Sequence, residues 1–306
     1  AGAVAERMKL TVYLAYSFLV SALIYPVFGH WIWGGGWLAA LPFGGGAKDF
    51  AGSGVVHVVG GLVALVGAAM VGPRAGKYDR DGSPRAIPGH NMTYVVVGTL
   101  FLFFGWFGFN AGSTMAAGDL RISVIAVNTF LAGATGAVTG LYLSLFRTGK
   151  ADITLACNGS LAGLVGVTAP SAFIAPWAAV VVGGIGALVM AWSLGFVERV
   201  LKVDDAVGAV SVHAAGGIWG LIAVGIFADG TYQGVKGMIL GDYAQLIAQL
   251  ITVAAVMAWA LLTGFLLFTI LKRTMGLRVS HEEELSGLDL SEHGISAYPA
   301  EQSIPL

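Results

Sequence analysis

Long apolar segments separated by short polar connections dominate the pattern of residues along this chain. A helix crosses the hydrocarbon core of a bilayer with about 20 predominantly apolar residues. Segments that meet or approach this length lie at residues 10–29, 50–71, 92–111, 121–146, 152–169, 174–197, 206–227 and 242–271. The pattern therefore predicts an all-α polytopic membrane protein with eight transmembrane helices, of which the segment at 152–169 is short and begins with polar residues.

Lysine and arginine are distributed unequally between the two sets of alternating connections. One set holds Arg7, Lys9, Arg74, Lys77, Arg80, Arg85, Arg147, Lys150, Arg199, Lys202, Lys272, Arg273 and Arg278, and the other holds Lys48, Arg121 and Lys236. Because cytoplasmic loops are enriched in Lys and Arg, this imbalance predicts that both ends of the chain are cytoplasmic. We expect residues 1–279 to form a transmembrane domain in the inner or plasma membrane, followed by an acidic cytoplasmic tail at 280–306.

Two segments repeat the same frame around a histidine. In "DFAGSGVVHVVGG" (49–61) and "DAVGAVSVHAAGG" (205–217), an Asp stands eight residues before the His and a Gly-Gly pair begins three residues after it. The topology places the two segments antiparallel, which predicts the inverted repeat common in transporters. At about 1.5 Å per residue, each His lies about 12 Å from its Asp, which places both near the middle of the bilayer.

The repeat also makes predictions about helix packing and chain length. Gly60, Gly61, Gly216 and Gly217 are expected to let the two helices approach closely. If the first copy of the repeat is as long as the second, it extends about 100 residues, or three helices, before Ala1. The expected total is then eleven transmembrane helices, eight of them present here.

Composition narrows the class further. The chain is 57% hydrophobic and 11% charged, with a net charge of −1, whereas soluble domains carry about 25% charged residues. The net charge gives no indication of nucleic-acid binding. The single cysteine, Cys157, excludes an internal disulfide and a cysteine-based metal cluster.

An ionisable residue in the middle of a membrane is a functional candidate by default, and His57 and His213 are matched in depth and frame. Histidines bonded to helix carbonyls are the structural alternative. Metal binding is disfavoured because two ligands make a poor zinc site, so we expect no metal and no cofactor. Two neutral imidazoles in contact can share a proton and leave their outer nitrogens for a small polar molecule or for proton transfer.

The same apolar surroundings restrict what can pass. A bare monovalent cation faces a prohibitive desolvation cost, whereas a cation that can lose a proton avoids it. Ammonium is the obvious small biological candidate. Aromatic residues in "HWIWGGG" (30–36) and "GWFGFNAGS" (105–113) could attract such a cation through their ring faces, although interfacial Trp residues commonly serve only as membrane anchors.

These motifs, together with "NTFLAGATGA", "NGSLAGLVGVTAP", "VDDAVGAVSVHAAGGIWG" and the tail "GLDLSEHGISAYP", resemble the Amt branch of the ammonium transporter family (Amt/Mep, related to Rh proteins). The resemblance covers essentially the whole chain. It implies an Amt-type bundle of eleven helices with an inverted five-helix repeat, a homotrimer, and a narrow apolar pore in each subunit. It also implies that a P-II-type signal protein could bind the cytoplasmic face.

The resemblance also assigns roles to particular residues. It implies pore residues His57, His213 and Phe109, an outer recruitment site at Trp33 and Ser113, and structural residues Asp49, Asp205, Trp106 and Asn110 near these sites. An Asp before a helix start also favours capping on physical grounds. The three absent helices would carry a second gate phenylalanine and another recruitment aromatic, so this chain is not expected to transport by itself.

The sequence therefore predicts a transporter rather than an enzyme. Ammonium would be recruited outside and deprotonated, and ammonia would pass the paired histidines. Two alternatives are an Amt-type ammonium sensor and an Rh-type channel for neutral ammonia. A sensor would show no uptake, and a neutral channel would carry no current.

Overall fold

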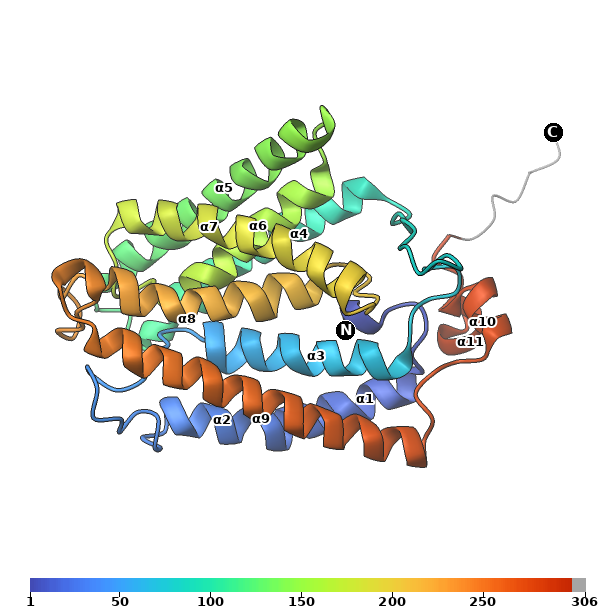
Figure 1. Ribbon diagram of the computed structural model, residues 1–306, viewed down its shortest axis with the longest axis horizontal. Helices are drawn as coiled ribbons and strands as arrows, with labels where there is room; N and C mark the ends of the chain where they lie inside the picture. The colour runs from blue at the N-terminus through green and yellow to red at the C-terminus, as the bar shows by residue number, and fades with distance from the viewer. Residues whose placement is uncertain (299–306) are drawn as a thin grey trace.

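The computed structural model describes residues 1–298, and this part of the chain is helical and contains no β-strand. The α-helices are α1 (Leu10–Leu19), α2 (Tyr25–Ile32), α3 (Val59–Val71), α4 (Met92–Ala111), α5 (Arg121–Thr148), α6 (Ile153–Thr168), α7 (Pro176–Gly195), α8 (Gly216–Phe227), α9 (Ala244–Thr274), α10 (His281–Ser286) and α11 (Leu288–His293). Figure 1 shows the long helices side by side along one axis, with the chain reversing direction at successive connections.

Every predicted apolar segment contains a helix. Six uninterrupted helical stretches are long and apolar enough to span a membrane, namely Leu10–Ile32, Ser53–Val71, Met92–Thr114, Arg121–Thr148, Pro176–Val200 and Ala244–Thr274. The other two segments form shorter apolar helices, Ile153–Thr168 and Ser211–Phe227. The first of these is largely buried among its neighbours, so its length need not match the lipid thickness.

The helices that carry the histidines begin later than the sequence predicted. The first starts at Ser53 instead of residue 50, and the second at Ala209, just before its π-helical turn, instead of residue 206. Gly52 adopts a φ of 116°. Only glycine adopts this conformation easily, and a residue in it cannot be part of a right-handed helix. The residues just after each Asp therefore form a turn, and a pattern of apolar residues alone does not reveal this turn.

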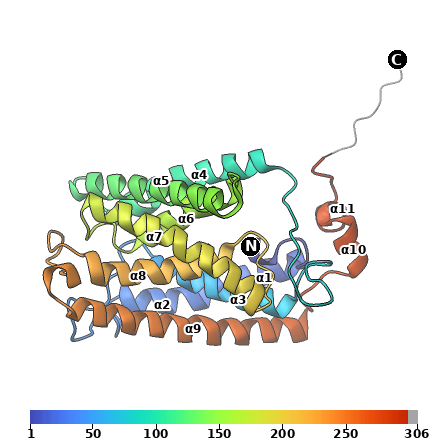
Figure 2. The same cartoon turned by 45° about the horizontal axis from the view of Figure 1, so that its top comes forward.

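Small residues allow the central helices to pack backbone against backbone. A Cβ atom on Gly159 of α6 would lie 2.5 Å from the carbonyl oxygen of Gly136 in α5, which no real side chain tolerates. Glycine interfaces of this kind are typical of membrane helices, where van der Waals contact drives association. Figure 2 shows α4, α5 and α6 on one side of the bundle, α2, α3 and α9 on the other, and α7 and α8 between them.

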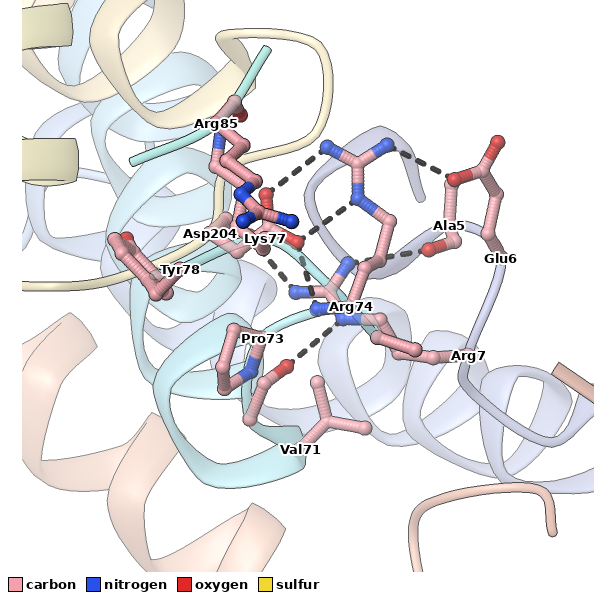
Figure 3. A network of polar contacts seen from close by, with 12 residues as sticks. Ala5, Glu6, Arg7, Val71, Pro73, Arg74, Lys77, Tyr78, Arg85 and Asp204 are labelled. Carbon is pink, nitrogen blue, oxygen red and sulfur yellow. Dashed lines mark hydrogen bonds and ion pairs between the residues drawn. The ribbon is translucent and has the colours of Figure 1, made fainter. Parts of the chain in front are cut away.

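Three segments meet in a buried charged cluster at the end of the bundle that also holds α10 and α11, which we call the tail end (Figure 3). Arg74 donates from Nε and Nη2 to the two carboxylate oxygens of Asp204, at 2.9 and 3.0 Å, and also pairs with Glu6. Arg7 is fully buried and donates to the carbonyls of Gly72 and Asp204. The cluster fastens the N-terminal segment and the loop after α3 to the turn that precedes His213.

The beginning of the predicted soluble tail is fastened to the end of α3. Arg278 donates to the carbonyls of Val71 and Pro73 and pairs with Glu284, which accepts the backbone N–H of Ala75 at 2.7 Å. Residues 299–306 of the predicted tail lie outside the described residues. The described part is therefore linked to the histidine-bearing helix rather than separate from it.

Candidate functional site

His57 and His213 contact each other in the interior of the bundle. Their Nδ1 atoms are 3.2 Å apart, and the rings are nearly parallel at 18°, with centroids separated by 5.1 Å. Each lies in a short π-helical turn, Ser53–Val58 and Ser211–Ala215, a feature frequently found at functional sites. The structure thus brings together two residues that are 156 positions apart.

The Nδ1–Nδ1 contact dictates how protons are arranged on a neutral pair. One Nδ1 must donate and the other must accept, so one ring presents a bare Nε2 and the other an Nε2–H. The Nε2 of His57 is buried and has no hydrogen-bond partner among the described residues. The pair can therefore offer one acceptor and one donor to a small polar molecule. The two roles reverse when the bare Nε2 takes up a proton, the shared proton crosses between the Nδ1 atoms, and the other Nε2 releases its proton.

Two aromatic rings pack against His57. Trp106 and Phe109 stack on His57 with centroid distances of 5.3 and 5.4 Å. The Trp106 indole donates to Thr168 at 2.9 Å, which fixes its orientation. Phe109 is more exposed, at 37%. Of the two aromatics that contact the histidine, Phe109 is therefore the more accessible.

Asp49 holds the start of the His57 helix. Its Oδ1 accepts the backbone N–H of Gly52, and its Oδ2 accepts those of Gly54 and Val55, at 2.8 to 2.9 Å. Asp205 caps the His213 helix in the same way, and its carboxylate accepts the backbone N–H groups of Ala209 and Val210. These bonds satisfy N–H groups that a helix start otherwise leaves unpaired.

The two copies also contact each other reciprocally. A Cβ on Gly61 would come within 2.9 Å of Ala214 Cα, and one on Gly217 within 2.8 Å of Val58 Cγ2. In each case a glycine four residues after one histidine meets the residue just after the other. This reciprocity is what a two-fold relation between antiparallel copies requires.

The expectation that both glycines of each pair lie between these helices was wrong. Gly60 has no atom within 4 Å of its Cβ position, and Gly216 faces Val165 of α6 at 3.5 Å. Neighbouring helix residues point about 100° apart because a turn holds 3.6 residues. Only one glycine of each pair can therefore face the partner helix.

The residues expected to recruit substrate lie near one end of this arrangement. Trp33 is 46% exposed, and its indole N–H donates to the backbone carbonyl of Asp49 at 2.6 Å. Ser113 donates to the carbonyl of Phe109 at 2.7 Å. One expected recruitment residue is thus joined to the cap of the His57 helix, and the other lies one turn beyond Phe109. Their joint role in binding stays a prediction.

Asn110 lies in α4, one turn after Trp106. It is buried, and its amide nitrogen donates to Thr129 of α5 at 3.0 Å. This contact ties α4 to α5, in keeping with a structural role. Among the described residues, no group of three His, Cys, Asp or Glu side chains is placed to hold a metal.

Several buried polar residues that support the site were missed in the sequence. Ser53 Oγ donates to the carbonyl of Val165 and accepts the N–H of Ala169, which fixes the first turn of the His57 helix on α6. Gln245 and Gln249 hold the loop before Asp49. The two glutamines stand four residues apart in an apolar segment, a spacing that places them on one helix face and could have revealed them.

Comparison with known proteins extends this picture. A sequence model of the Ammonium Transporter Family matches residues 1–298. Ammonium transporter Amt2 of Archaeoglobus fulgidus is 52% identical, over 100% of this chain and 69% of its own length. Ammonium transporter 1 member 3 of Solanum lycopersicum is 41% identical, over 98% of this chain and 72% of its own.

Solved structures give the same result. A sensor Amt protein superposes with a TM-score of 0.89 at 38% identity, over 96% of this chain and 72% of that chain. Mep2 of Saccharomyces cerevisiae superposes with a TM-score of 0.82 at 32% identity, over 92% of this chain and 63% of that chain. The described helices thus superpose on a large part of each structure.

Proposed function

This chain belongs to the ammonium transporter family, and we propose that it conducts ammonium across a cell membrane as ammonia and a proton. The family is one of transporters rather than of enzymes. The observation that carries the proposal is the buried His57–His213 contact, beside which the Nε2 of His57 has no hydrogen-bond partner in residues 1–298. A path of this kind suits a neutral hydrogen-bonding molecule and is hostile to an intact cation.

We propose that the chemistry runs in three stages. Ammonium is attracted at the outer end by the face of Trp33 and the hydroxyl of Ser113. It gives up a proton to the bare Nε2 of the histidine pair, because a charged ion is not stabilised in the apolar section. Ammonia then exchanges hydrogen bonds with the Nε2 atoms of the histidines, while the Nδ1–Nδ1 contact offers a route for the proton.

A sensor role is the second candidate, and the similarity to a sensor Amt protein favours it. A sensor would bind ammonium through the same residues and report occupancy without net transport. A neutral ammonia channel of the Rh type is the third. These classes differ in uptake and in charge movement, so one pair of measurements separates them.

We further propose the surroundings in which the protein acts. Both ends of the chain would be cytoplasmic in a cell membrane, and residues 280–306 would form a cytoplasmic tail open to a P-II-type protein. Large exposed apolar side chains such as Phe146 and Trp192 are suited to lipid or to neighbouring subunits of a homotrimer. Native mass measurement in mild detergent should give three copies, and a monomer would contradict the assembly.

The central test uses the full-length protein in liposomes, with radiolabelled methylammonium uptake and membrane current as readouts. Replacing both His57 and His213 by Ala should abolish the proton-coupled current, because no group remains to relay the proton. His293→Ala, on the exposed tail helix α11, serves as the matched control. An unchanged current in the double variant would contradict the proposal that the histidine pair relays the proton. If the wild-type protein takes up methylammonium without a current, the result favours the neutral channel. If it binds methylammonium without taking it up, the result favours the sensor.

A further inference from the structure

Two buried glutamines of α9 hold the loop that runs from Trp33, one of the two expected recruitment residues, to Asp49. Gln245 and Gln249 are 1% and 0% exposed. Gln245 accepts the N–H of Gly45 and donates to the carbonyl of Gly46, at 3.0 and 2.9 Å. Burying a primary amide is costly unless its donors and acceptors are paired, so two such residues in an apolar helix require a reason.

Gln249 makes every hydrogen bond its amide can make. Its Oε1 accepts the N–H of Lys48 at 2.9 Å and the Nε2 of Gln245 at 3.1 Å. Its Nε2 donates to the carbonyls of Lys48 and Leu221, at 2.8 and 2.9 Å. The amide thus grips the peptide groups on both sides of Lys48 and joins them to α8.

Asp49, the residue after Lys48, links this loop to both Trp33 and the His57 helix. Asp49 caps the His57 helix through its carboxylate, and its backbone carbonyl holds the indole of Trp33 at 2.6 Å. Leu221 lies in α8, which continues the turn that carries His213. Gln249 is therefore connected on one side to the outer aromatic and on the other to the helix of the second histidine.

We propose that Gln249, supported by Gln245, is a positioning residue that sets the affinity of the outer site for ammonium. This role rests on the proposed function, because it presumes that Trp33 binds the substrate cation. By fixing the backbone at Lys48 and Asp49, Gln249 holds the Trp33 ring at the angle and depth that a cation–π contact needs. It does not touch the substrate itself.

A role in positioning the outer site predicts a change in affinity with little change in maximal rate. Passage along the histidine pair is left intact when only the loop shifts. Gln249→Met keeps the size of the side chain and removes its hydrogen bonds. The half-saturation concentration for methylammonium should rise roughly tenfold, the scale expected when hydrogen bonds that hold a binding group are lost, and the maximal rate should change less than about twofold.

The experiment measures concentration-dependent methylammonium uptake by the full-length protein in liposomes. Thr252→Val is the matched control, since Thr252 is equally buried in α9 and, within the described part of the chain, its hydroxyl bonds only to Ala248 of that helix. Half-saturation does not depend on how much protein folds, so partial loss of folded material leaves the readout valid. If Gln249→Met gives no folded protein, the same measurement is made on Gln245→Met. We expect this variant to raise the half-saturation concentration for methylammonium by a smaller factor.

The possible outcomes separate the inference from the proposed function. A raised half-saturation in the glutamine variants, with the control unaltered, supports the positioning role. Wild-type uptake together with unaltered half-saturation in both variants overturns the role and leaves the proposed function standing. A fall in maximal rate alone also overturns it. Wild-type protein that neither takes up nor binds methylammonium overturns both.

Discussion

Asp49 shows how one residue can fix both the start of a helix and the orientation of a neighbouring indole. Its two oxygens accept three backbone N–H groups at the start of the His57 helix, and its carbonyl orients Trp33. A carboxylate provides acceptors on both oxygens, whereas an amide would direct its NH₂ group at N–H donors. The requirement for Asp at this position is therefore electrostatic and geometric.

Replacing Asp49 by Asn should destabilise the protein by about 1–3 kcal/mol, because buried N–H groups lose their acceptor. Thermal unfolding in detergent provides the measurement. Asp242→Asn is the matched control, since one amide oxygen can still accept the single bond that Asp242 makes to Ala244. Equal unfolding temperatures for the two variants would contradict the capping role.

At the scale of elements, the antiparallel helices α3 and α8 place the histidines. Each helix is capped by its own Asp, has a π-helical turn at or near its start, and meets the other through a glycine. The contact between Gly61 and Ala214 leaves no room for a side chain. The distance between the two imidazoles thus depends on residues that carry no chemistry.

Gly61→Ala should disrupt this contact, since the added methyl would lie 2.9 Å from Ala214 Cα. We expect a loss of roughly 1–3 kcal/mol in stability, as is typical of overpacking in a close-packed interior. Gly60→Ala is the control, because it meets open space and alanine favours a helix over glycine by up to about 1 kcal/mol. Thermal unfolding that ranks the two variants in the opposite order would refute the assigned interface.

For the whole molecule, the cluster at the tail end connects distant parts of the chain. Arg74 and Asp204 form a buried, bidentate pair between the loop after α3 and the turn before His213. Burial alone would raise the pKa of the Asp204 carboxyl. The hydrogen bonds and charge of Arg74 outweigh this effect and hold its pKa below the ordinary value of 3.8.

The sign of this shift gives a prediction for acid stability. A carboxyl whose pKa is lower in the folded state stabilises the fold fully above its unfolded pKa, and this contribution is lost as the pH falls through the folded value. Unfolding temperature should therefore drop as the pH decreases below about 4. Asp204→Asn should lower stability at neutral pH by up to about 3 kcal/mol and weaken the acid dependence. An unaltered acid profile would exclude this pair as a source of it.

The pattern of residues along the chain was enough to predict a helical membrane protein and to pair His57 with His213. Apolar length predicts the spans because a bilayer core has a fixed thickness, and the matched frames around His57 and His213 indicated an antiparallel pair. Those conclusions need only local composition and spacing. They were sufficient for the helical fold and for the two residues that the structure brings into contact.

Which atoms come into contact could be read only from the folded arrangement of the helices. Three contacts depend on how helices distant in sequence are rotated about their axes. They are the contact between the two Nδ1 atoms, the contact that one glycine of each pair makes with the opposite helix, and the hydrogen bonds from Gln249 to Lys48. Rotation is set by side-chain packing across interfaces, and hydropathy does not encode it. Hydropathy also does not predict the buried cluster at the tail end. From the sequence, Arg7 and Arg74 indicated only which side of the membrane their connections occupy, whereas in the structure they form this cluster.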